Sequence, residues 1–213
     1  MPTANTTDTE TEKRRQRDRD LILLFLLLME DTHANLVAKC TAYLTGAASL
    51  TSLSDALVTV LWAAHTQSTV LGRQLAGYGG QDDAGARQFA ATVMDEQVPY
   101  LEGLVQDLAG GRYPLADGSV SPALSARLRL HAQRIRGTAN DAWSQSLPAD
   151  TLIEWRLGPN ANHCPSCPVF AAGSPYRADS LPTTPGSADC ICLSACRCSL
   201  VVVATGATGF PLD

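Results

Sequence analysis

Six of the seven cysteines lie between positions 164 and 198, and cysteine is the residue type whose spacing most clearly indicates chemistry. The pattern is Cys164-Pro-Ser-Cys167 followed by Cys190-Ile-Cys192-Leu-Ser-Ala-Cys196-Arg-Cys198. Two thiolates separated by two residues can reach one ion, and a second pair about 25 to 30 residues later completes a tetrahedral Zn²⁺ shell. The spacing therefore predicts a bound Zn²⁺.

Cys164 and Cys167 are the two predicted ligands that the spacing defines most clearly, and Cys192, Cys196 and Cys198 compete for the other two positions. Four of five cysteines are the expected ligands, with Cys192 and Cys198 contested, and Cys190 is the expected spare. The five candidates are Cys164, Cys167, Cys192, Cys196 and Cys198.

Clustered cysteines also occur as disulfide knots, free thiols or redox pairs, and the compartment decides between these states. Leu21–Met29 has the length of a signal-peptide core, but about 20 residues with balanced charges precede it and no A-x-A-like site follows. We therefore expect no cleaved signal peptide, and reduced, metal-bound cysteines. The surroundings of the C-x-x-C pair do not have the βαβ pattern of a redox protein.

The zinc is expected to be structural, because a catalytic site keeps an open position and draws on histidine and a carboxylate base. His163 is the one histidine near the cysteines; it could be a ligand, a donor to one or simply exposed, and we assign it no ligand or catalytic role. The sequence has no H-x-E deaminase motif, nucleophile elbow or phosphate-binding loop. We predict no enzymatic activity, no catalytic residues and no further cofactor.

The composition predicts a packed protein without a polyanionic partner. Of 213 residues, 45% are hydrophobic and 17% are charged, and the net charge is −5. Between 151 and 213 there is no lysine, and four acidic residues outnumber three arginines, so we expect no direct DNA binding by this part. No uninterrupted apolar run reaches about 18 residues, so we expect no membrane span.

Apolar residues at three- and four-residue steps predict helices over about 10–46, 52–77, 82–109 and 121–145. Ser52-Leu-Ser-Asp55 fits a capping box at the start of the second helix. Pro99 should kink or split the third helix. Cys40 is expected to be a small core residue in the first helix.

The composition changes near Leu147-Pro148, where prolines and cysteines become frequent. The predicted fold is mainly α: an antiparallel helical bundle, then a small, loop-rich, zinc-stapled module with short β-strands near 151–157 and 198–204. The expected divisions are a flexible tail (1–9), the bundle (10–148) and the cysteine-rich module (149–213). A module this small has little hydrophobic core of its own and needs a stabilising cross-link such as a structural metal ion.

Further motifs accompany the cysteines. A tryptophan segment, Glu154-Trp155-Arg156-Leu157-Gly158, precedes the C-x-x-C pair, and His163 is directly followed by the first cysteine of that pair. Gly173-Ser-Pro-Tyr176, Leu181-Pro182 and Pro185-Gly186 follow, and the last motif is Cys192-Leu-Ser-Ala-Cys196-Arg-Cys198-Ser-Leu200. Together these motifs resemble the Mu-F-like family of tailed-phage head morphogenesis (minor capsid) proteins, over residues 125–200. The helical half resembles that family only in general architecture, as a divergent helical bundle that precedes the C-x-x-C pair.

The resemblance implies a structural protein of the phage head. Many members carry histidine at the position of Leu193, so Cys192 is the expected substitute and an all-cysteine site is favoured. The implied partners are the portal and the major capsid protein, with an oligomeric arrangement in the virion and assembly in the host cytoplasm. Some relatives carry an enzyme domain after the C-R-C motif, and residues 201–213 are too few for one. The alternative is a cellular adaptor protein with a zinc module.

Three expectations follow for the structure and its metal. Leu21–Met29 is apolar all round, so a partner subunit or several helices should cover it. Trp155 should pack beside Cys164 or Cys198. About one zinc ion per chain is expected, and its removal should unfold residues 151–200 while leaving the helical circular dichroism mostly intact.

Overall fold

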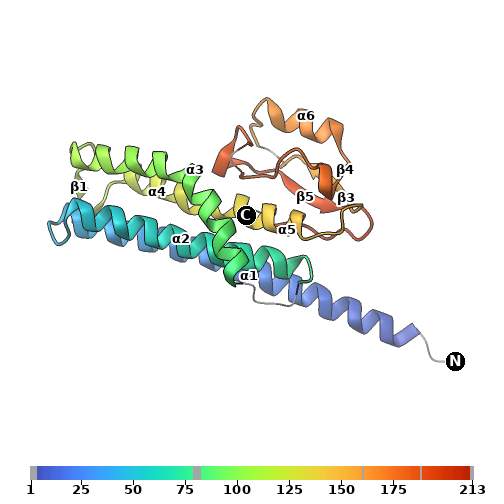
Figure 1. Cartoon of the computed structure of the whole chain (residues 1–213). Coiled ribbons are helices and arrows are strands. Elements are labelled where there is room, and N and C mark those ends of the chain that lie inside the picture. The colour runs from blue at the N-terminus through green and yellow to red at the C-terminus, as the bar shows by residue number, and fades with distance from the viewer. Residues whose placement is uncertain (1–3, 79–82, 160, 188, 212–213) are drawn as a thin grey trace.

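The computed structural model describes residues 4–78, 83–159, 161–187 and 189–211, and shows long helices lying beside a small sheet (Figure 1). The helices are α1 (Ala4–Leu44), α2 (Leu50–Leu75), α3 (Asp83–Ala109), α4 (Pro122–Gln133), α5 (Ile135–Gln145) and α6 (Ser166–Gly173). The strands are β1 (Leu115–Ala116), β2 (Ser119–Val120), β3 (Leu152–Arg156), β4 (Tyr176–Arg177) and β5 (Ser199–Val202). The predicted fold class, a mainly helical bundle followed by a loop-rich cysteine region with short strands, is confirmed.

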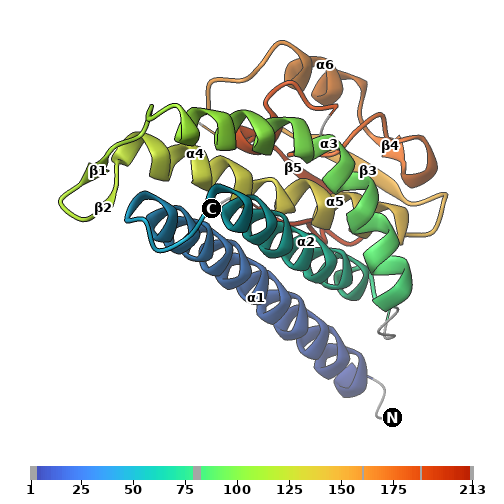
Figure 2. The same cartoon turned by 60° about the vertical axis from the view of Figure 1, so that its left-hand side comes forward.

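Helix α2 occupies the middle of the bundle, where it contacts α1, α3 and α5. Figure 2 shows α1 and α2 side by side and antiparallel. The hydroxyl of Ser49 caps α2 by accepting a hydrogen bond from the N–H of Ser52 at 3.1 Å. The expected cap at Ser52 was therefore wrong by one turn, because Ser49 is the residue with extended backbone and a side-chain acceptor.

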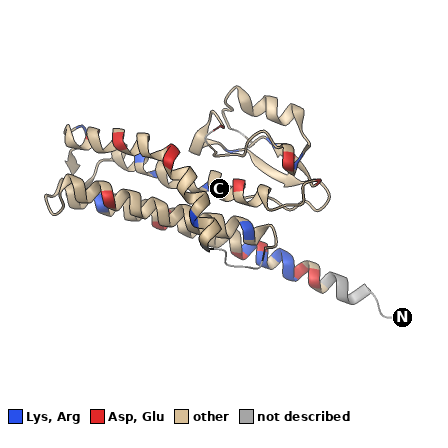
Figure 3. Ribbon diagram, in the orientation of Figure 1, with Lys and Arg blue, Asp and Glu red and all other residues tan. Residues whose placement is uncertain are grey.

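Helix α1 begins at Ala4, so residues 4–9 are helical and the expected flexible tail is wrong for them. Residues 1–3 lie outside the described residues. Extending a helix that is already nucleated fixes one residue for each hydrogen bond gained, which makes such an extension inexpensive. Figure 3, in which the ribbon is coloured by charge, shows the charged residues of α1 gathered toward its N-terminal end, ahead of the leucine-rich stretch.

Helix α3 is continuous through Pro99, and Figure 1 shows it bent rather than split. It leads into a β1–β2 hairpin that the sequence analysis did not anticipate. The hairpin turns at Asp117 and Gly118, whose φ angles are 53° and 78°. A left-handed Asp-Gly pair is the usual signal for a two-residue hairpin turn.

The predicted fourth helix is in fact two helices, α4 and α5, with Arg134 at the break. Just after the break, Gly137 lies against the backbone of Gly186, and a Cβ at Gly137 would collide with that carbonyl. The Arg134 guanidinium also donates a hydrogen bond to the Gly186 carbonyl. The C-terminal chain therefore packs directly onto the joint between the two helices.

The C-terminal strands form an antiparallel sheet in the order β4-β3-β5. The central strand, β3, pairs Trp155 with Leu200 and Ile153 with Val202 of β5. The positions of β3 and β5 confirm the two strands expected from the sequence. This sheet places Trp155 on one strand and the Cys196–Cys198 motif at the start of another.

Two hydrophobic cores divide the bundle along its length. One core lies among the helices, with Val120 of β2 at its edge, and includes Leu36, Cys40, Leu57 and Leu104, so Cys40 is the small core residue expected. The other core joins both halves of the chain. Its members include residues of α1, α2 and α5 together with β3, β5 and the cysteines: Phe25, Leu71, Trp143, Trp155, Cys167, Cys196 and Leu200.

The leucine-rich stretch of α1 is covered on one side only. Leu21, Phe25 and Met29 are buried, and Phe25 packs against the ring of Phe210. On the other side Leu23, Leu24 and Leu27 are each more than half exposed. The remaining helices therefore do not enclose this stretch on several sides, which was one of the two arrangements expected.

Helix α1 meets the length and composition criteria for crossing a membrane. An 18-residue window within Thr9–Leu44 has a mean hydropathy of 1.6, and 28% of it is buried. Core helices of soluble proteins and signal sequences meet the same criteria, and Phe25 of this helix belongs to the core shared with β3 and β5.

Candidate metal centre

The six C-terminal cysteines converge from three segments. Cys164 and Cys167 flank the start of α6, Cys190 and Cys192 lie in the loop that follows residue 189, and the Cys196–Cys198 motif leads into β5. All six are free thiols. Their sulfur atoms form two groups, each with all members within 4.8 Å of one another. The groups are Cys164, Cys167, Cys190 and Cys192, and Cys167, Cys196 and Cys198.

The spacing of the sulfur atoms suits tetrahedral coordination. Four sulfurs bound at about 2.3 Å around one ion stand about 3.8 Å apart. The Sγ of Cys167 lies 3.4 Å from that of Cys164, 3.6 Å from that of Cys192 and 3.8 Å from that of Cys196. The sulfur of Cys167 thus stands at nearly tetrahedral spacing from members of both groups.

Contacts among the thiols move their pKa values in opposite directions. Contact with Cys196 is the largest cause that lowers the pKa of Cys198 to about 5 and that of Cys190 to about 6. The pKa of Cys196 itself is raised by the same pair of contacts. Burial raises the pKa of Cys167. Protons shared between sulfurs in this way are those that a divalent cation displaces when it binds.

Trp155 covers the cluster as expected. Its side chain is 2% exposed and its ring lies 5.0 Å from that of Phe170 on α6. The indole N–H meets no acceptor in good hydrogen-bond geometry among the described residues, and the Cys198 sulfur lies beside it. A metal-bound thiolate accepts such a hydrogen bond better than a thiol does, because it carries negative charge. The buried N–H thus fits a thiolate–metal centre.

Arg136 connects the cysteine segment to the bundle. This arginine of α5 is 1% exposed, and its guanidinium donates hydrogen bonds to the carbonyls of Cys196, Cys198 and Phe210. Four thiolates around one Zn²⁺ carry a formal charge of −2, so a buried cation next to two of the cysteines lowers the cost of burying that charge.

His163 is closer to the sulfurs than the sequence analysis assumed. Its Nδ1 lies 3.9 Å from the Sγ of Cys198. It also lines a small cavity together with Cys192 and Arg197. The imidazole is half-buried, so it stands at the boundary between the cluster and solvent.

All five candidate ligands are brought together, and the expected spare joins them. Cys190 is fully buried and belongs to the same sulfur group as Cys164 and Cys167. The C-x-C spacing of Cys190 and Cys192 was the available signal, because it repeats the spacing of Cys196 and Cys198. The choice of four ligands from these residues stays a prediction.

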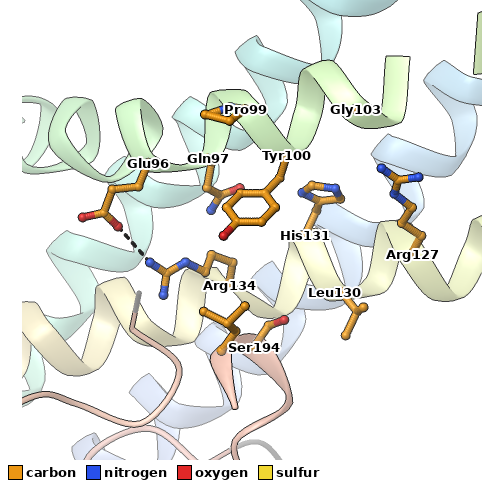
Figure 4. A pocket seen from close by; sticks show the side chains of 11 residues that line it. Glu96, Gln97, Pro99, Tyr100, Gly103, Arg127, Leu130, His131, Arg134 and Ser194 are labelled. Atoms are coloured by element: carbon orange, nitrogen blue, oxygen red, sulfur yellow. Dashed lines mark hydrogen bonds and ion pairs between the residues drawn. The ribbon is translucent and has the colours of Figure 1, made fainter. Parts of the chain in front are cut away.

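A cavity of about 430 Å³ lies between α3, α4 and the loop at Leu193. Figure 4 shows its wall, in which Glu96 and Arg134 form an ion pair with 3.0 Å between the carboxylate and guanidinium atoms. Burial lowers the pKa of His131, also in the wall, to about 4, so this imidazole is neutral at pH 7. We assign the chemistry of the molecule to the cysteine cluster and not to this cavity.

A buried histidine lies behind the same wall. The Nδ1 of His65 is 2.7 Å from the hydroxyl oxygen of Thr138, and its Nε2 is 2.6 Å from the amide nitrogen of Gln97. This arrangement suits a neutral ring that donates through Nδ1 and accepts through Nε2. Burial, reinforced by the positive charge of Arg134, lowers the pKa of His65 to about 3.

The neutral His65 predicts a specific loss of stability in acid. Between the unfolded pKa near 6.5 and the folded value, only the unfolded chain gains a proton, so the free energy of unfolding falls as the pH falls. Between pH 7 and pH 5 this contribution amounts to about 2 kcal/mol. The stability difference between wild type and His65→Gln should shrink by that amount over this range in urea titrations. Other acid effects, including loss of metal, cancel because both proteins share them. A difference that does not change with pH would contradict the assignment.

The fold and this cluster define a class: a mainly helical protein whose C-terminal part gathers six cysteines that could hold a metal ion. No family model, no curated protein and no solved structure matches the chain.

Proposed function

We propose that this protein is a non-enzymatic structural protein that assembles with other subunits, specifically a minor capsid or head morphogenesis protein of a tailed phage. The observation that carries the assembly role is the uncovered leucine face of α1, formed by Leu23, Leu24 and Leu27. The C-terminal motif described above supports the phage assignment. In this proposal a thiolate-bound Zn²⁺ is a structural staple, and the partner is the portal or the major capsid protein.

The leucine face has the properties of a protein contact. Its three side chains are 53 to 57% exposed and lie on one side of a helix whose other side is buried in the core. The helix is therefore held rigidly, and the face is displayed without further folding. Surfaces of this kind are usually covered in the assembled state, because their burial removes apolar area from water.

The test is a triple variant, Leu23→Gln, Leu24→Gln and Leu27→Gln. These exposed changes should leave the helical circular dichroism and the metal content of the purified protein unchanged. Incorporation into phage particles, measured by quantitative mass spectrometry of purified heads, should fall at least tenfold. The matched control is Val169→Gln with Val203→Gln, two exposed apolar residues elsewhere on the surface. The control should be incorporated normally.

The outcomes separate the candidate partners. Normal incorporation of the triple variant would refute the assembly role of this face. Binding of the wild type to lipid vesicles, abolished in the triple variant, would show a membrane and not a subunit as the partner and would overturn the proposal. The cellular adaptor fits the same face and staple, and it is favoured if the gene has no portal or terminase gene beside it.

A further inference from the structure

We propose that the cysteine cluster holds two divalent metal ions, bridged by the thiolate of Cys167, with His163 completing the shell of the second ion. This inference rests on the structural metal centre of the proposed function and deepens it. Its starting point is that the sulfurs do not form one tetrahedron with two spares. They form two overlapping groups that have Cys167 in common.

The number of donors matches two ions that share one ligand. Two separate tetrahedral shells need eight donors, and one bridging donor reduces that number to seven. The cluster offers six sulfurs and one imidazole nitrogen, which is seven. The first ion takes the sulfurs of the larger group. The second takes the bridging sulfur with Cys196, Cys198 and His163.

Cys167 has the position that a bridging ligand requires. Its sulfur lies within 4 Å of the sulfur of Cys164 and of that of Cys192 in the first group, and of that of Cys196 in the second. Its side chain is fully buried, so its sulfur faces protein sulfurs and not water. It also stands at the first turn of α6, which fixes it between the two segments.

His163 stands beside Cys198, from where its imidazole could take the fourth position of the second shell. A nitrogen at about 2.0 Å and a sulfur at about 2.3 Å from one ion are about 3.5 Å apart. The Nδ1 of His163 lies 3.9 Å from the Sγ of Cys198. The ring does not lie within 4.8 Å of all three sulfurs of the second group, so it must turn inward from the edge of the cluster to bind this ion.

A second ion also accounts for the burial of the remaining cysteines. One ion uses four ligands, which leaves at least two cysteines of the cluster beside charged thiolates without a metal. Cys190, Cys196 and Cys198 are all at most 1% exposed. Six thiolates with two Zn²⁺ carry a formal −2, the same as one ordinary four-thiolate site, and Arg136 lies alongside.

The experiment is a metal count on the full chain, expressed and purified with zinc under reducing conditions. Elemental analysis and native mass spectrometry should give two zinc ions per chain. Substitution with ¹¹³Cd should give two NMR resonances, because one ion has four sulfur ligands and the other has three sulfurs and one nitrogen.

Single variants should remove different ions. Cys190→Ser should lose the resonance of the four-sulfur ion, and His163→Ala should lose the other, each leaving about one ion per chain. The matched control is Cys40→Ser, which removes a buried cysteine from the helical core and should retain two ions.

The outcomes distinguish this inference from the proposed function. One ion per chain in the wild type overturns the two-ion inference and leaves the structural staple intact. No metal, with oxidised cysteines, refutes the metal centre itself. Two ions that both persist in His163→Ala overturn the ligand assignment and therefore the inference as stated.

Discussion

Removal of the proposed metal ion with a chelator should unfold the cysteine-containing end of the molecule, including parts of its helices, while the other end stays folded. The core that contains the cysteines also contains Phe25 of α1, Leu71 of α2 and Trp143 of α5. Metal binding supplies about 10 kcal/mol in small zinc modules, which is comparable to the whole stability of a domain. Without it, the β3–β5 sheet and the side chains packed on it lose their support.

Hydrogen exchange measured by mass spectrometry would show this pattern directly. After chelation, protection should fall by two orders of magnitude or more in β3, β5 and α5, and in α1 around Leu21–Met29. Protection should persist in the helical core around Leu36 and Leu57. Added zinc should restore the lost protection. Intact protection throughout α5 would contradict this prediction, and so would uniform loss across the whole bundle.

The sequence predicted the parts of this outcome that depend on local pattern. Helical periodicity located the bundle, and C-x-x-C spacing located the cluster, because both signals depend on neighbouring residues. The expectation that the helices would be indifferent to the metal rested on treating 10–148 and 149–213 as separate units. Which core a buried residue joins is a tertiary property, so Phe25 gave no local sign that it would meet Phe210.

The parts of the candidate site that the sequence left open have the same origin. Cys190 was set aside because a single tetrahedral shell needs only four ligands, and spacing alone does not reveal how segments far apart in sequence converge. His163 was assigned no role because no partner was visible in the sequence. The break at Arg134 lies where Gly186, 52 residues later, packs against the helix, and this contact between distant residues leaves no sign in the local periodicity.

Replacement of Arg136 should destabilise the protein more than any other single change of a charged residue named above. Its guanidinium serves three backbone carbonyls, two of them in the C-R-C motif and the third at Phe210. In Arg136→Leu these buried acceptors lose their donor, at about 1–3 kcal/mol for each. A loss of at least about 3 kcal/mol in the free energy of unfolding is therefore expected in urea titrations with zinc present.

Two further variants identify the cause. Arg136→Lys keeps the positive charge, but a point-like ammonium cannot reach three carbonyls arranged for a planar fork, so it should recover less than half of the loss. Arg156→Leu is the matched control, because Arg156 is exposed on β3 and pairs with Glu154, and such pairs contribute about 0–1 kcal/mol. If Arg136→Lys were as stable as wild type, charge compensation of the thiolates and not carbonyl binding would be the role of this arginine. If Arg136→Leu cost no more than Arg156→Leu, the link between α5 and the cysteine segment would have to lie in apolar packing alone.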